Sequence, residues 1–148
     1  MDEEKIVSPQ DLSSEREPSK PSNLRVLIVD DVKTNRQLLY YILKKEGFQV
    51  EEALEGAQAI RLFQEWSPHI ILMDHLMPVM DGLEATEQIR SLPGGDKVLI
   101  FVITANVMEE NESASRKAGA NAFIRKPFRK AVLLEEIQKH LPLLEKML

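Results

Sequence analysis

Polar side chains that can carry acid and phosphate chemistry stand within two residues after the ends of apolar runs of the sequence. Asp30 and Asp31 follow one run, Asp74 follows another, and Thr104 and Lys126 come after two more. Carboxylates that lie close together repel one another, and a hard dication such as Mg²⁺ relieves that repulsion. An aspartate carboxylate can also be the nucleophile of phosphoryl transfer, a reaction that needs chiefly positioning and neutralised charge.

Each of these residues also fits an ordinary role when it is taken singly. An aspartate before a helix often caps it, a threonine hydroxyl often bonds its own turn, and a lysine is usually solvated. Their common placement after apolar runs favours one shared site instead. The expected site contains Asp30, Asp31 and Asp74 around Mg²⁺, and Lys126, the Thr104 hydroxyl and the backbone N–H of Ala105 around a phosphoryl group.

The elements that must position these residues are five short apolar strands that alternate with amphipathic helices. The expected strands are residues 25–29, 49–53, 70–73, 98–103 and 122–124. The expected helices are residues 34–46, 57–64, 83–91, 109–118 and 130–144. The first, third and fourth strands are almost wholly apolar, which is typical of a parallel sheet covered by helices on both faces. The pattern therefore predicts an α/β, doubly wound sandwich with residues 49–53 at an edge.

The expected position of the site follows from this fold class. In an open parallel sheet, ligands bind beyond the carboxyl ends of the strands, near the point where the strand order reverses. The candidate site residues stand at those strand ends. In the first helix, Leu38, Leu39, Ile42 and Leu43 are expected on the buried face, with Gly47 near the helix end.

Composition bounds the remaining possibilities. Residues 1–23 carry three prolines and a net charge of −3, so we expect a flexible tail or linker there and one domain over residues 24–148. The net charge of the whole chain is −5, which gives no support to nucleic-acid binding. The chain has no cysteine, no apolar run long enough to span a bilayer, and an acidic start unlike a secretory signal. We expect a cytoplasmic protein.

Four separate segments resemble the response-regulator receiver family of two-component signalling. They are Val29-Asp30-Asp31, Met73-Asp74-His75-Leu76-Met77-Pro78-Val79-Met80-Asp81-Gly82, Thr104-Ala105 and Lys126-Pro127-Phe128. The resemblance covers residues 24–141 or so and is nearest to receivers of hybrid histidine kinases. It implies a flavodoxin-like (βα)5 sandwich with strand order 2-1-3-4-5. It also implies a Mg²⁺-dependent phosphoacceptor that signals by a change of conformation.

The resemblance assigns a role to each matching residue of the acid cluster. Asp74 resembles the phosphoacceptor, Asp31 a direct Mg²⁺ ligand, and Asp30 a ligand that acts largely through bound water. Leu76 would give its backbone carbonyl to the metal. Lys126 would pair with Asp74 and later with the phosphoryl group.

Further roles implied by the resemblance concern switching and partners. Thr104 and Phe123 resemble the switch pair, although Phe123 lacks the hydroxyl of a tyrosine, so the preference of its ring must rest on packing. The Lys126–Pro127 bond would be cis. The implied phosphoryl donor is a histidine kinase or a histidine phosphotransfer domain, and a downstream effector or output domain would read the signal. Self-catalysed transfer and hydrolysis alone would not make the chain a conventional enzyme.

Other classes remain open at the level of sequence. A phosphohydrolase that works through an aspartyl phosphate would need a second acid two residues after the nucleophile, where this chain has Leu76. A nucleotide or flavin binder would need a glycine-rich turn after the first strand, where Asp30 and Asp31 stand. A module that binds partners without phosphorylation would not need the acid set.

Overall fold

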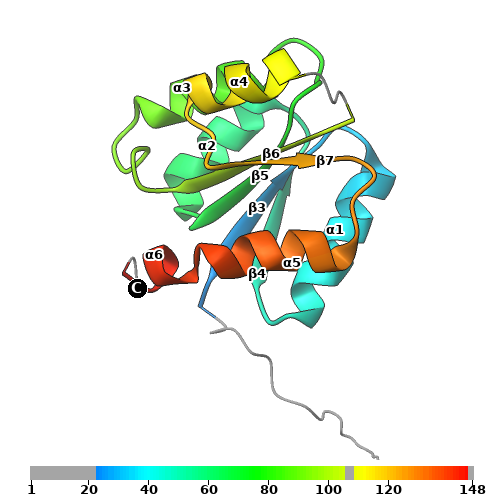
Figure 1. The fold of residues 1–148 in the computed structure, drawn as a ribbon. Coiled ribbons are helices and arrows are strands. Elements are labelled where there is room, and N and C mark those ends of the chain that lie inside the picture. Colours follow the sequence, from blue (N-terminus) through cyan, green and yellow to red (C-terminus); the bar gives the residue numbers. More distant parts are fainter. Residues whose placement is uncertain (1–22, 106–108, 147–148) are drawn as a thin grey trace, which may run out of the picture.

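A computed structural model describes residues 23–105 and 109–146. The predicted tail, residues 1–23, lies outside the described residues except for Asn23, so that prediction stays untested. Strands and helices carry the labels of Figure 1. Among the described residues, no helix has the length and the apolar composition needed to cross a membrane.

Five parallel strands form one sheet in the order β4-β3-β5-β6-β7, which is the predicted order 2-1-3-4-5. The strands are β3 (Arg25–Val29), β4 (Gln49–Ala53), β5 (Ile70–Asp74), β6 (Leu99–Thr104) and β7 (Ala122–Arg125). The predicted edge position of residues 49–53 is confirmed. Strands β5, β6 and β7 each end one residue later than expected, so Asp74 and Thr104 are themselves the last residues of central strands.

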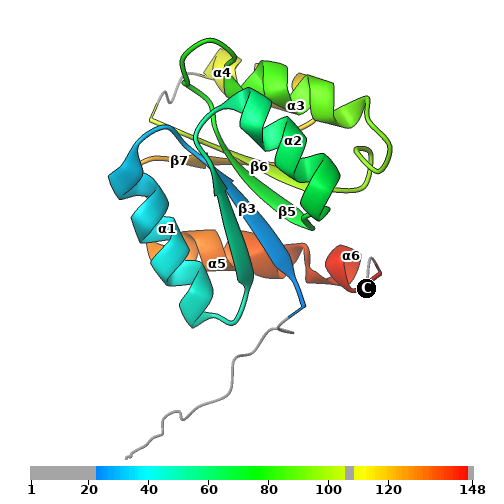
Figure 2. The same cartoon turned by 180° about the vertical axis from the view of Figure 1, so that it is seen from behind.

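Helices cover both faces of the sheet (Figures 1 and 2). They are α1 (Lys33–Lys45), α2 (Gly56–Trp66), α3 (Gly82–Arg90), α4 (Glu109–Ala118), α5 (Lys130–Lys139) and α6 (Leu141–Lys146). Helices α1 and α5 lie on one face, and α2, α3 and α4 lie on the other. This is the doubly wound sandwich that the alternating pattern predicts.

The single helix expected over residues 130–144 is wrong, because the chain forms two helices there. Helix α5 ends with His140 as its C-cap, and α6 begins at Leu141. Pro142 explains the break: it has no N–H to continue the hydrogen-bond ladder, and its ring would clash with the carbonyl four residues earlier. Pro142 is tolerated in the first turn of α6 instead.

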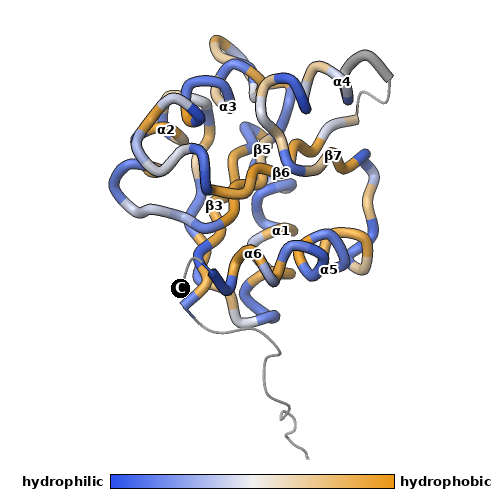
Figure 3. Tube along the Cα trace, turned by 60° about the vertical axis from the view of Figure 1, so that its left-hand side comes forward, coloured by the Kyte–Doolittle hydropathy of each residue, from blue (hydrophilic) through white to orange (hydrophobic). Residues whose placement is uncertain are grey.

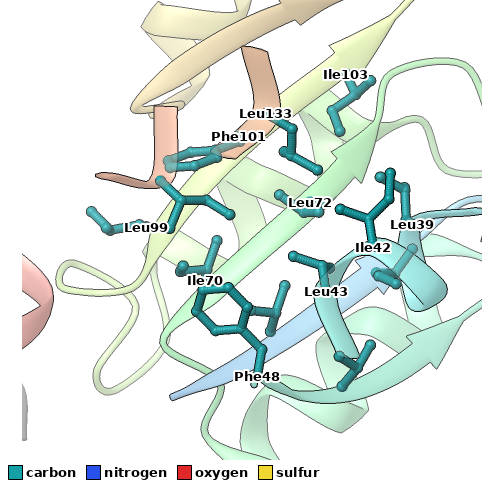
Figure 4. Close-up of a cluster of buried hydrophobic side chains, with 14 of the residues drawn as sticks. Leu39, Ile42, Leu43, Phe48, Ile70, Leu72, Leu99, Phe101, Ile103 and Leu133 are labelled. Carbon is teal, nitrogen blue, oxygen red and sulfur yellow. The ribbon is translucent and has the colours of Figure 1, made fainter. Parts of the chain in front are cut away.

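Alternate residues of the strands point into two separate hydrophobic layers. In β5, Leu72 faces α1 and α5, whereas Met73 faces the opposite layer under α2 and α3. Figure 3 shows the strands as the apolar centre of the molecule, and Figure 4 shows Leu72 among the side chains of the first layer. A sheet that is buried on both faces fixes the strand register, because a slip of one residue would exchange the two faces.

The buried face of α1 differs from the expected one at two positions. Leu39, Ile42 and Leu43 are buried as predicted, but Leu38 is 53% exposed and Arg36 is buried. Residues 36, 39 and 43 share a face at the spacing of α-helical turns. A prediction of the buried face from apolar residues alone therefore includes Leu38 and omits Arg36, because such a prediction cannot identify a buried arginine.

We expect Leu72→Ala to lower the free energy of unfolding by about 2–5 kcal/mol, because it leaves a cavity in a close-packed layer. Leu38→Ala removes the same atoms from a half-exposed position and should change it by only about 0.5 kcal/mol. Urea denaturation of both variants measures the difference. Equal losses would contradict this description of the core.

Candidate phosphoacceptor and metal site

Asp30 is a buried carboxylate in the turn between β3 and α1, and three donors hold it. Its Oδ1 accepts a hydrogen bond from the backbone N–H of Val32 at 2.9 Å. Its Oδ2 accepts from Asn35 Nδ2 and from Lys126 Nζ, both at 3.2 Å. The side chain is thus fixed in direction, with only 2% of the residue exposed.

Asp31 is exposed beside this fixed carboxylate. The alternative that the aspartates merely cap α1 is not supported, because the N-cap of that helix is Val32 and no side chain caps it. Oxygen atoms of Asp30, Asp31 and Asp74 all lie within 4.8 Å of one another. The predicted convergence of the three carboxylates is therefore present in the fold.

Asp74 closes β5 at the centre of the sheet and is 7% exposed. The pKa of its carboxyl is raised from 3.8 to about 6, chiefly by burial, then by the nearby charge of Asp30 and, to a smaller extent, by that of Asp31. Lys126 opposes this shift of the pKa. Asp74 therefore holds its negative charge at a cost, and a cation at this place would reduce that cost.

Lys126 supplies the positive charge of the cluster. Its Nζ lies 3.2 Å from Oδ2 of Asp30 and 3.5 Å from Oδ1 of Asp74. The expected pairing with Asp74 is thus present but shared, and the shorter contact is with Asp30. The Lys126–Pro127 bond is cis, as the family resemblance implied.

Of the remaining predicted residues, Thr104, Ala105 and Leu76 lie at the same end of the sheet, and Phe123 lies within β7. Thr104 is buried at the end of β6 and Ala105 is exposed directly after it. Leu76 follows β5 with its side chain 58% exposed. Phe123 is partly buried against the layer under α2 and α3, and the guanidinium carbon of Arg125 lies 5.9 Å from its ring centroid.

The loop after Asp74 is held by short-range contacts. Asp81 caps α3, as its Oδ1 accepts a hydrogen bond from Glu84 N at 2.9 Å. A Cβ atom at Gly82 would lie 2.1 Å from the backbone oxygen of Asp74, closer than atoms can approach. Glycine is therefore required where α3 begins against the last residue of β5.

These residues fit a hard divalent cation. Among the described residues, three carboxylates meet the single ammonium group of Lys126, so the cluster keeps an excess negative charge once Asp74 is ionised. Mg²⁺ prefers oxygen ligands and retains several waters, which suits one exposed and two buried carboxylates. The donor set contains neither sulfur nor imidazole, the ligands that softer metals prefer.

A cavity of about 720 Å³ lies at the other end of the sheet, lined by Arg25, His69 and Asn121 among others. Its size does not make it the functional site, because the crowded charges and the raised pKa of Asp74 are found at the carboxyl ends of the strands. Chemistry rather than volume identifies the site.

Three residues that support the site were not predicted from the sequence. Asn35 donates to Asp30 Oδ2, and Arg36 donates to the Asp30 carbonyl at 2.9 Å. Glu52 on β4 accepts from Arg36. The polar residues four and five positions after Asp31 were a possible signal on α1, since both follow the acid pair by about one helical turn.

Comparisons with known proteins agree with this geometry. Residues 26–138 match the family model of the response regulator receiver domain. The chemotaxis protein CheY of Halobacterium salinarum is 36% identical over 113 residues, which cover 76% of this chain and 92% of the relative. CheY of Bacillus subtilis is 39% identical over 118 residues, covering 79% and 97%.

A solved structure is similar as well. The receiver domain of a sensor histidine kinase from Pseudomonas aeruginosa has a TM-score of 0.74 and 32% identity, over 79% of this chain and 96% of that one. That structure has a magnesium ion coordinated in its active site cleft. The present chain belongs to the response regulator receiver domain family.

Membership of this family establishes the broad function. The chain is a phosphoacceptor domain of two-component signalling. Receiver domains bind Mg²⁺ in an acidic pocket, and the described residues of this chain include a cluster of three aspartates that is compatible with Mg²⁺ binding. The alternatives of a phosphohydrolase and of a phosphorylation-independent module are not favoured.

The raised pKa of Asp74 predicts a pH-dependent gain in stability for Asp74→Asn in EDTA. A carboxyl whose pKa is about 6 when folded and 3.8 ordinarily destabilises the fold when ionised, fully above pH 6 and not at all below 3.8. At about pH 8 the variant should unfold with a free energy about 1–3 kcal/mol higher than the wild type.

Urea denaturation at several pH values measures this gain, which should shrink as the pH falls from 6 towards 3.8. A variant less stable than the wild type at about pH 8, or a difference independent of pH, would show that Asp74 is not strained by its surroundings.

Proposed function

We propose that Asp74 accepts a phosphoryl group from a phosphohistidine donor in a Mg²⁺-dependent reaction. The observation that carries this proposal is the placement of carboxylate oxygens of Asp30, Asp31 and Asp74 within 4.8 Å of one another, with Lys126 against two of them. Such a group of charges serves no packing purpose. The carboxylates can neutralise a bound cation, and the cation together with Lys126 can neutralise a phosphate.

In the proposed step, an oxygen of ionised Asp74 forms a bond to phosphorus while the bond from phosphorus to the donor histidine nitrogen breaks. The electron pair of the broken bond stays with the imidazole, which leaves as neutral histidine once it is protonated. Bound Mg²⁺ would supply positive charge to the phosphoryl oxygens, held by Asp30, Asp31, Asp74 and the Leu76 carbonyl. Lys126 would supply a second positive charge from the side of Asp74 that it already contacts.

The proposed switch uses residues at the end of β6 and within β7. The Thr104 hydroxyl and the Ala105 N–H would donate hydrogen bonds to the phosphoryl oxygens. Movement of Thr104 would open space for the ring of Phe123, which is only partly buried in the present conformation. Because Phe123 has no hydroxyl, packing and the nearby Arg125 guanidinium would govern which position the ring prefers.

The proposed donor is a histidine kinase or a histidine phosphotransfer domain, acting on this chain in the cytoplasm. Leu38 and Tyr41 on α1 are 53% and 60% exposed, so α1 offers apolar surface to a protein that approaches the site. A downstream effector or output domain would read the phosphorylated state. Water would remove the phosphoryl group from Asp74 without turnover of a free substrate, so the chain would not be a conventional enzyme.

Labelling with a small phosphodonor tests the acceptor. With phosphoramidate and Mg²⁺, the wild type should gain a single phosphoryl adduct in intact-protein mass spectrometry, and Asp74→Asn should gain none because its amide is not a nucleophile. Asp81→Asn is the matched control, since it changes a nearby aspartate that only caps α3. An adduct on Asp74→Asn would move the acceptor to another residue.

A magnesium titration tests the metal site separately. Removal of a direct ligand by Asp31→Ala should weaken Mg²⁺ binding by more than the roughly 10- to 100-fold that the loss of an outer partner costs. Calorimetry in a buffer well above the pKa of Asp74 measures this affinity. Asp96→Asn, at an exposed acid of the opposite cavity, should bind like the wild type. An unchanged affinity in Asp31→Ala would exclude Asp31 as a ligand.

A further inference from the structure

We infer that Arg36, paired with Glu52, is a positioning residue that holds the Asp30–Asp31 turn in the shape that receives Mg²⁺. The inference rests on the proposed function, because it assigns to the same site a support that reaches to the edge strand of the sheet. Arg36 contacts none of the reacting groups directly. Its effect would pass through the backbone of Asp30.

The contacts of Arg36 are short, and each uses a different nitrogen. Nη1 donates to the carbonyl oxygen of Asp30 at 2.9 Å in a buried hydrogen bond. Nε donates to Oε1 of Glu52 at 3.0 Å. The side chain of Arg36 is 11% exposed and that of Glu52 is 35% exposed. The planar guanidinium therefore joins α1, the β3–α1 turn and strand β4.

These contacts complete the restraint of Asp30. Its N–H donates to Ala53 O at 3.1 Å, which continues the pairing of β3 with β4. Its carboxylate is held by the three donors of the turn, of α1 and of Lys126. The Asp30 carbonyl belongs to the peptide unit that leads into Asp31. The bond from Arg36 thus orients the peptide that determines where the exposed Asp31 carboxylate points.

The charge of Glu52 explains why a guanidinium can remain at this place. A buried cation is costly unless it is paired, and the nearest large concentration of negative charge is the acid cluster itself. An ion pair with Glu52 on β4 keeps the Arg36 cation at the Asp30 carbonyl and away from the carboxylates. Arg36 would otherwise compete with a metal ion for Asp31 and Asp74. Both partners are therefore needed for a turn that is ordered and still open to a cation.

Positioning and simple electrostatics predict opposite results for the loss of this charge. If Arg36 acted only through its charge, its removal would make the site more negative and would tighten Mg²⁺ binding. If Arg36 acts by orienting the turn, removal weakens binding in spite of the added negative potential. Lysine keeps the charge, but a single ammonium lacks the planar fork that reaches both acceptors. The sign of the change in affinity therefore separates the two roles.

The experiment compares Mg²⁺ affinity, measured by calorimetry, in the wild type, Arg36→Lys, Arg36→Met and Glu52→Ala. We expect roughly 10- to 100-fold weaker binding in all three variants, the range found when outer partners of a metal site are lost. Arg25→Lys is the matched control. The guanidinium of Arg25 also donates hydrogen bonds to a backbone carbonyl oxygen, that of Ser67, but Arg25 lies at the other end of β3. Its replacement should leave the affinity unchanged.

A second readout separates positioning from general loss of structure. The rate of labelling by phosphoramidate, measured against Mg²⁺ concentration, should reach the wild-type maximum in Arg36→Lys, but at a roughly 10- to 100-fold higher Mg²⁺ concentration. A variant that had merely lost structure would have a lower maximum at every concentration. That lower maximum would overturn the inference.

Two other outcomes would also overturn it. One is an Arg36→Lys variant that binds Mg²⁺ as tightly as the wild type, and the other is an Arg36→Met variant that binds it more tightly. Either result leaves the proposed function intact, provided that the wild type binds Mg²⁺ and is labelled on Asp74. A wild type that binds no Mg²⁺ refutes the proposed function itself, and the two failures are therefore distinguishable.

Discussion

The mutual repulsion of three carboxylates at one end of the sheet is the constraint on which the rest of this structure depends. Asp74 is buried beside Asp30, and its pKa is raised to about 6 as a consequence. Lys126, 3.2 Å from one of these carboxylates and 3.5 Å from the other, offsets part of the repulsion. The site is thus incompletely neutralised by the protein alone. It is prepared for a cation and for a group that a cation stabilises.

A parallel sheet is well suited to hold like charges close together. Adjacent parallel strands bring their carboxyl ends to one edge, so residues distant in sequence meet without long loops. The two hydrophobic layers, of which Leu72 and Met73 belong to one each, fix the register of β5 on both faces. Asp74 is therefore held by the burial of the strand that precedes it. The free energy gained by burying the two hydrophobic layers compensates for the unfavourable repulsion among the carboxylates.

The sequence was sufficient to predict the edge strand and the convergence of the acids, because those follow from apolar runs and the residues after them, and the family resemblance supplied the strand order. The break at His140 was missed, although Pro142 marks it, since the apolar stripe continues across both helices. The position of Arg36 about one helical turn after the acid pair was a possible signal, but its pairing with Glu52 was beyond prediction. This pairing joins residues 16 apart in the chain through a buried guanidinium, and no periodic pattern signals such a contact. The sharing of Lys126 between Asp30 and Asp74 likewise could not be predicted, because it depends on distances between side chains far apart in the sequence.

The most direct measurement of the central claim is the pKa of the Asp74 carboxyl, followed by carboxyl-carbon NMR with and without Mg²⁺. Without metal, the pKa should be about 6, well above its ordinary 3.8. Saturating Mg²⁺ should lower it clearly, because a bound dication favours the ionised carboxylate. A pKa near 3.8 that does not respond to Mg²⁺ would contradict the claim that Asp74 belongs to a strained acid cluster that holds a cation.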